Sequence, residues 1–179
     1  MKIPKSQSGY SLVEIIIYVA IFAMLAVVVI NSVIVVMASF TETRTNRDLQ
    51  ESGYTSLERI SREIRQAKSI DVADSTLGGT NPSFGILVLN TTDGSGNARV
   101  VKFAVVSGAL DIYEGTTFAN LALTGNLLNQ NINTTSLIFR QITTTVGGAV
   151  KVEMTLQDQR GKARESQNFY DTIILRNEY

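Results

Sequence analysis

The feature that most constrains this chain is an uninterrupted apolar stretch close to its first residue. Between Ile15 and Phe40, 23 of 26 residues are apolar, and the run contains no Pro, no Gly and no charge. A bilayer core of about 30 Å needs about 20 consecutive apolar residues in a helix. A core helix of a soluble protein would normally keep a polar side, and this stretch has none from Ile15 to Ile30. We therefore predict a membrane-spanning helix.

A short basic segment precedes the apolar stretch. Residues 1–9 read MKIPKSQSG and carry Lys2 and Lys5 but no acidic residue. Positive charge beside a span favours the cytoplasmic side, so we expect a cytoplasmic N-terminus and an extracytoplasmic body, although Arg44 and Arg47 reduce the charge contrast. The stretch exceeds the apolar region of about 7–15 residues in a secretory signal peptide, which predicts that the span is retained.

Composition argues against several classes of chemistry. The chain has 179 residues with 16 basic and 16 acidic side chains, so net charge gives no reason to expect a nucleic-acid partner. It has no Cys, no His and no Trp, which removes disulfides, Cys/His metal sites and Ser/His/Asp triads. We expect no enzymatic activity, no catalytic residue, no cofactor and no metal site.

An amphipathic segment follows the span. Its apolar positions are spaced by three, four and three residues: Leu57, Ile60, Ile64 and Ala67. This period predicts that the helix continues over residues 41–69. We expect the pair Arg59 and Glu63 on the exposed side, where a four-residue pair contributes only a few tenths of a kcal/mol, and Gly53 as a weak point of the helix. The basic side chains here are interrupted by acids and are interpreted as solvated surface, not as a DNA-binding face.

Residues 70–179 have the pattern of β-strands between turn residues. Six runs predict strands: 85–90, 99–106, 110–114, 137–145, 150–157 and 169–175. We expect an α+β fold in which one antiparallel sheet covers the apolar stripe of the helix. The loop from Asp93 to Asn97 carries oxygen side chains at alternating positions, as calcium loops do, but it lacks a downstream Glu ligand. A hairpin loop is the favoured interpretation.

The junction between the basic segment and the apolar stretch reads Gly9-Tyr10-Ser11-Leu12-Val13-Glu14. It resembles the cleavage and methylation motif of type IV pilins and type II secretion pseudopilins. The resemblance implies that a membrane prepilin peptidase cuts after Gly9 and methylates the new amine of Tyr10, where the family usually has Phe. It also implies that Glu14 pairs with the N-terminal ammonium of a neighbouring subunit.

The resemblance also implies an organisation and a set of partners. Residues 1–9 would be a leader that is removed, 10–40 a transmembrane and filament-core helix, 41–69 its amphipathic continuation and 70–179 an extracytoplasmic head. The implied partners are other pilin or pseudopilin subunits, the prepilin peptidase, an inner-membrane assembly platform and membrane lipid. The implied location is the bacterial cytoplasmic membrane and the assembled pilus or pseudopilus.

Several assignments within the family stay open. Major pilins often carry a Pro in the apolar segment, whereas none occurs here between Pro4 and Pro82, which favours a minor subunit. The body is most similar to the J-type pseudopilin and the W-type minor pilin, while Glu14 argues against the tip subunit. The sequence does not separate a type IV or competence pilus from type II secretion. Two further alternatives remain open. One is a DNA-capturing minor pilin, and the other is an uncleaved membrane-anchored binding or enzyme domain.

Overall fold

The computed structural model describes residues 11–144, 147–160 and 165–175. Contacts divide the chain into two compact units, Met1–Arg44 and Thr45–Tyr179. One helix, α1 (Leu12–Gln66), supplies the described structure of the first unit and continues into the second. The predictions for Gly9 and Tyr10 concern residues outside the described ranges.

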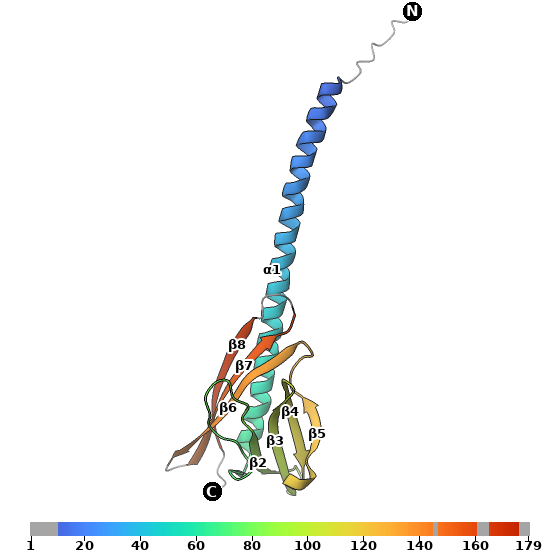
Figure 1. Cartoon of the computed structure of the whole chain (residues 1–179). Helices are drawn as coiled ribbons and strands as arrows, with labels where there is room; N and C mark the ends of the chain where they lie inside the picture. The colour runs from blue at the N-terminus through green and yellow to red at the C-terminus, as the bar shows by residue number, and fades with distance from the viewer. Residues whose placement is uncertain (1–10, 145–146, 161–164, 176–179) are drawn as a thin grey trace, which may run out of the picture. The chain divides into compact units, whose positions relative to one another are not determined.

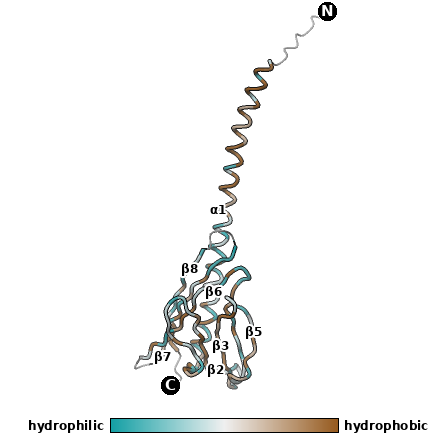
Figure 2. The backbone as a smooth tube through the Cα atoms, viewed as in Figure 1, coloured by the Kyte–Doolittle hydropathy of each residue, from teal (hydrophilic) through white to brown (hydrophobic). Residues whose placement is uncertain are grey.

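The first unit is a helix without packing partners in the described chain. From Leu12 to Arg44 every residue is exposed except Glu14 and Ala26, which are partly exposed. Figure 2 shows the apolar character of this part of α1 along its length. A window of α1 near the N-terminus is long and apolar enough to cross a membrane, and none of it is buried. At 1.5 Å per residue, the 26-residue stretch from Ile15 to Phe40 extends about 39 Å, which exceeds the hydrocarbon thickness of about 30 Å.

The second unit begins where α1 acquires a buried side. The fully or nearly buried apolar positions of the helix are Leu49, Leu57, Ile60 and Ile64, and Ala67 directly after the helix is also buried, so the predicted stripe is confirmed. The helix ends at Gln66, three residues before the expected limit of 69. Two contacts account for this end: the Thr91 hydroxyl donates to the Gln66 carbonyl at 3.0 Å, and the Lys68 N–H donates to the Asn90 carbonyl at 2.8 Å.

Five antiparallel strands form the larger sheet, in the order β1-β2-β3-β4-β5. Their bounds are β1 Ser69–Ile70, β2 Leu87–Thr92, β3 Ala98–Val106, β4 Ala109–Gly115 and β5 Ala122–Asn126, with a short 3-10 helix η1 at Phe118–Asn120. The loop between β2 and β3 is a hairpin loop, as expected. There the Asp93 carboxylate accepts the N–H groups of Ser95 and Asn97 at 2.9 and 2.8 Å.

Three further antiparallel strands form a second sheet, in the order β6-β7-β8. Their bounds are β6 Ile132–Thr144, β7 Gly147–Asp158 and β8 Ser166–Ile174. The predicted α+β fold of a long helix and antiparallel strands is confirmed, but the strands form two sheets and not one. The outer edge of β6 is occupied by the segment just before β2, and no strand of the larger sheet pairs there. The Gly85 N–H donates to the Leu137 carbonyl at 2.7 Å, and the Leu137 N–H donates to the Ser83 carbonyl at 2.6 Å.

Residues 45–66 of α1 and both sheets share one core (Figure 1). Phe103 of β3, Phe139 of β6 and Met154 of β7 are among its largest fully buried side chains. The six predicted strands correspond to β2, β3, β4, β6, β7 and β8. The sequence missed β1, which has two residues, and β5, which is exposed at four of its five positions and so has no alternating apolar pattern.

Gly53 is a packing position in this core, whereas the sequence suggested only a weak point. The helix is continuous through Gly53, which is buried. A Cβ placed there would collide with the Phe169 ring of β8. The same ring meets Tyr54 edge to face, with ring centroids 5.8 Å apart. The missing side chain of Gly53 therefore lets an aromatic ring of the second sheet contact the helix backbone.

Candidate functional site: the start of the apolar helix

The described part of the N-terminal motif begins at Ser11, immediately before α1. Glu14 lies in the first turn of the helix, where a negative charge interacts favourably with the helix dipole. Its side chain is partly exposed. The Tyr18 hydroxyl, one turn further on, donates a hydrogen bond to Glu14 Oε1 at 2.9 Å. Sequence reasoning missed Tyr18, although the four-residue spacing was a signal that could have identified it.

Three hydroxyl side chains of the first unit, those of Ser32, Thr41 and Thr43, donate to carbonyl groups of the helix itself. Ser32 donates to the Val28 carbonyl at 2.8 Å, and Thr41 donates to the Met37 carbonyl at 3.0 Å. Such bonds to the carbonyl four residues earlier satisfy a polar group within its own helix. In hydrocarbon, where water is absent, a helix must satisfy its polar groups in this way or with a partner. These positions are therefore compatible with a lipid or protein surrounding.

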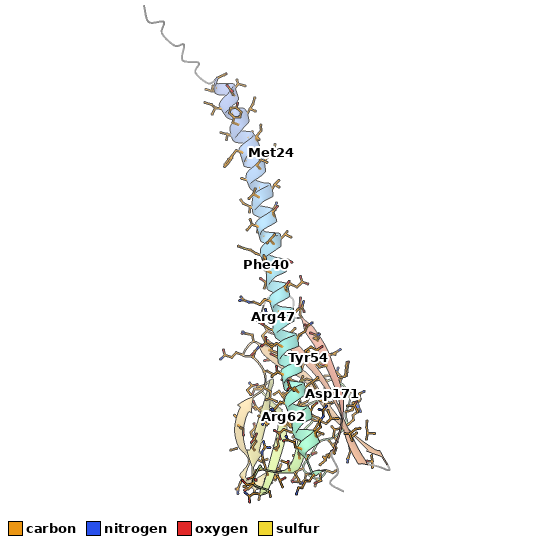
Figure 3. The ribbon with its side chains drawn as sticks, turned by 180° about the vertical axis from the view of Figure 1, so that it is seen from behind. Met24, Phe40, Arg47, Tyr54, Arg62 and Asp171 are labelled. Atoms are coloured by element: carbon orange, nitrogen blue, oxygen red, sulfur yellow. The ribbon has the colours of Figure 1, made fainter. Side chains whose placement is uncertain are left out.

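The exposed apolar surface of residues 12–40 is much larger than isolated surface side chains require. Large apolar side chains along it are 47% to 74% exposed, with Met24 at 73% and Phe40 at 72%. Figure 3 shows Met24 and Phe40 projecting from the helix. Continuous apolar surface on this scale indicates a membrane or a protein partner.

A buried charge network joins α1 to the larger sheet. The Glu63 side chain is only 3% exposed and pairs with Arg59 at 2.9 Å and with Arg99 of β3 at 3.0 Å. Both guanidinium groups also contact Glu114 of β4 at 2.9 Å. The prediction that Arg59 and Glu63 form an exposed pair is therefore wrong, because Arg99 and Glu114 cover the Glu63 carboxylate. A carboxylate buried without these partners would be costly, so the network is structural.

A second charge cluster lies where α1 enters the second unit. The Asp158 side chain is fully buried, and Arg160 contacts it at 2.6 Å while also contacting Asp48 of α1 at 2.7 Å. Burial by itself would raise the pKa of Asp158, but the hydrogen bonds and charge of Arg160 outweigh burial and lower it. This cluster attaches the chain after β7 to the first buried turn of the helix.

A hollow of the second unit lies beside α1 and β8, with a volume of about 620 Å³. Tyr54 and Arg62 line it from the helix and Asp171 from β8 (Figure 3). The Ser61 hydroxyl donates to the Asp171 carboxylate, and the Asp171 Oδ1 accepts the Thr172 N–H at 2.8 Å. The Asp171 carboxylate is thus already engaged by its own sheet and helix. Within the described residues, no three His, Cys, Asp or Glu side chains gather as a possible metal site.

Comparison with protein-family models gives one match, the prokaryotic N-terminal methylation motif, over residues 4–30. No curated protein and no solved structure matches the chain significantly. The matched residues cover the end of the basic segment from Pro4, the junction and the first part of α1. The motif indicates a prepilin-type pilin or pseudopilin subunit, and together with the apolar helix it supports membrane anchoring. It suggests a structural subunit more than an enzyme, and the α+β fold of a long N-terminal helix packed with antiparallel sheets is pilin-like.

Proposed function

We propose that this chain is a minor pilin or minor pseudopilin that is inserted in the bacterial cytoplasmic membrane as a prepilin. It then joins a type IV pilus or type II secretion-type filament through α1. One observation carries this proposal: the methylation motif ends within a helix whose residues 12–44 have no packing partner in the described chain. An exposed apolar helix needs lipid before assembly and other helices afterwards.

The first step is removal of the leader on the cytoplasmic side. Hydrolysis of the peptide bond between Gly9 and Tyr10 releases residues 1–9, which contain Lys2 and Lys5. The new amine of Tyr10 then takes a methyl group from a methyl donor, whose bond to that methyl breaks, and releases one proton; the methylated amine is a cation at neutral pH. The mature chain accordingly begins with a single positive charge four residues before Glu14.

The second step is assembly through opposite charges in an apolar surrounding. The Glu14 carboxylate and the Tyr10 ammonium of a neighbouring subunit are each costly to bury alone, and pairing offsets part of that cost. If two apolar helices were shifted along their axes to any other relative position, both charges would be left unpaired, and that position would be less stable. In this proposal Glu14 sets the axial register of the filament, while the second unit forms the extracytoplasmic head.

The assignment to a minor subunit rests on the lack of Pro in the apolar segment and on similarity to J-type and W-type subunits. The choice between a pilus and a secretion filament is tested by asking which assembly genes lie beside the gene for this chain. In both systems the partners would be other filament subunits, the prepilin peptidase and the assembly platform.

N-terminal mass spectrometry of the protein isolated from membranes tests the proposal. We expect a mature chain that starts at N-methylated Tyr10, and we expect Gly9→Leu to retain residues 1–9. The matched substitution Ser8→Ala should be cleaved normally. A native protein that keeps residues 1–9 would instead identify an uncleaved membrane-anchored binding or enzyme domain and would overturn the filament proposal.

A further inference from the structure

The hydrogen bond between Tyr18 and Glu14 joins two side chains of the apolar helix. Among described residues 11–44 it is the one hydrogen bond between side chains, since the bonded hydroxyls of Ser32, Thr41 and Thr43 donate to backbone carbonyls. Helical side chains point toward the N-terminus, so the Tyr18 ring lies over the turn that carries Glu14. The hydroxyl approaches Oε1 to 2.9 Å.

The carboxylate keeps acceptor capacity after it has accepted this bond. An ionised carboxylate has two oxygens and only accepts hydrogen bonds. Tyr18 occupies Oε1, whereas Oε2 has no hydrogen-bond or ion-pair partner among the described residues. A bond to one oxygen restricts the rotation of the side chain and replaces one of the water molecules that the carboxylate loses in an apolar surrounding. The other oxygen remains available for a cation from outside the chain.

We propose that Tyr18 is a positioning residue for filament assembly: it holds the Glu14 carboxylate so that Oε2 receives the N-terminal ammonium of a neighbouring subunit. This inference rests on the proposed function, because it assumes that Glu14 pairs with that ammonium. The new element is that the Tyr18 hydroxyl already holds the Glu14 carboxylate in place before the neighbouring subunit binds. A preorganised group loses less conformational entropy when the ion pair forms.

The test compares full-length Tyr18→Phe with the parent protein in cells that assemble the filament. The substitution keeps the ring and removes only the hydroxyl. We expect normal membrane insertion, cleavage and methylation, with incorporation into isolated filaments reduced about threefold to tenfold, as for one hydrogen bond within a membrane or to a charged group. The matched control is Tyr54→Phe, which removes a hydroxyl from an exposed aromatic side chain of the second unit and should leave incorporation unchanged.

A double-mutant comparison separates positioning of Glu14 from a general role of the Tyr18 hydroxyl. Tyrosine is also common at membrane interfaces, and that role would not depend on Glu14. In a Glu14→Gln background we expect Tyr18→Phe to have little further effect on incorporation. An equal loss in both backgrounds, or full incorporation of the single Tyr18→Phe variant, would overturn the positioning role.

A second measurement covers the case in which Glu14→Gln leaves too little incorporation to compare. A membrane-permeant carbodiimide activates a carboxylate, and an adjacent amine then displaces a urea to form an amide. In assembled filaments we expect this treatment to join Glu14 to a neighbouring N-terminus, with a yield per incorporated subunit at least about threefold lower in Tyr18→Phe. An unchanged yield would contradict the positioning role, whereas normal incorporation of Glu14→Ala would contradict the charge pairing of the proposed function.

Discussion

Residues 12–44 and residues 45–66 belong to one continuous helix, yet only the second group has packing partners within the described chain. In the first group large apolar side chains such as Phe22 and Val35 are 73% and 68% exposed, whereas Ile60 and Ile64 in the second are fully buried. The same backbone conformation therefore has two sources of stability. Lipid or other subunits must supply the partners of the first part, and the two sheets supply those of the second.

The largest expected effect follows from breaking the charge network that joins the second part of α1 to the larger sheet. Glu63→Ala leaves Arg59 and Arg99 without their shared buried carboxylate. Loss of one partner of a buried ion pair costs about 3–5 kcal/mol. Urea unfolding of a head fragment starting at Thr45 should show this decrease in the free energy of unfolding. Glu58→Ala, at an exposed position one turn earlier, should change it by less than about 0.5 kcal/mol.

A matched pair of apolar substitutions tests the contrast between the two parts of α1 directly. Ile60→Ala removes a fully buried side chain and should reduce the stability of the second unit by about 2–5 kcal/mol. Ile30, which is 58% exposed, should tolerate Ala with no change in the melting temperature of the second unit. Thermal unfolding of the full chain in detergent, followed by circular dichroism, measures both. A similar decrease for the two variants would contradict the assignment of separate partners.

The contact between Gly53 and Phe169 tests, at a single backbone position, how closely the second part of α1 packs against β8. Gly53→Ala should raise helix propensity by about 1 kcal/mol, but its new Cβ collides with the buried ring, and such overpacking costs about 1–3 kcal/mol. We expect a net loss of about 1 kcal/mol in urea unfolding. Thr55→Ala, exposed on the same helix, is the control. In a Phe169→Leu background Gly53→Ala should cost less, and an unchanged cost would remove the ring as the cause.

Local patterns were sufficient to predict the helix, its apolar stripe and six of the strands. Each depends on neighbouring residues: the stripe of Leu57, Ile60 and Ile64 repeats with the helical period, and β7 alternates between buried and partly exposed residues. The junction around Glu14 was also recognisable, because the order of basic leader, glycine, carboxylate and apolar stretch is contained in one short segment.

Contacts between distant parts of the chain could not be predicted in this way. Glu63 has the local pattern of a surface pair with Arg59, and its burial depends on Arg99, 36 residues away. Gly53 is separated from Phe169 by more than half of the chain. The division into two sheets likewise depends on which segment occupies the edge of β6, and neither periodicity nor turn residues specify that choice.

The smallest expected effect concerns the cluster where α1 becomes buried, and it depends on pH. Arg160 lowers the pKa of Asp158 below the ordinary value of 3.8 in the folded state. A depressed carboxyl pKa contributes stability above the unfolded-state pKa, and this contribution disappears as the pH falls through the folded-state pKa. The ionised Asp158 should therefore stabilise the second unit at neutral pH, by about 1 kcal/mol because Arg160 is partly exposed.

The measurement is the free energy of unfolding of the head fragment and of its Asp158→Asn variant between pH 7 and pH 3. The difference between the two should be nearly constant at neutral pH and should shrink as the pH falls below about 4. Using the difference removes the opposite contribution of Asp111, whose pKa is raised by burial. It also removes the contribution of the half-buried Glu153, whose pKa is lowered by its hydrogen bonds with Lys151 and Arg140. Asp93→Asn in the β2–β3 loop is a control for a carboxylate held only by its own loop. A difference that stays constant down to pH 3 would show that the folded chain holds the protonated Asp158 carboxyl group as well as the ionised one. The charge of Arg160 would then add nothing to the attachment of the chain after β7 to α1.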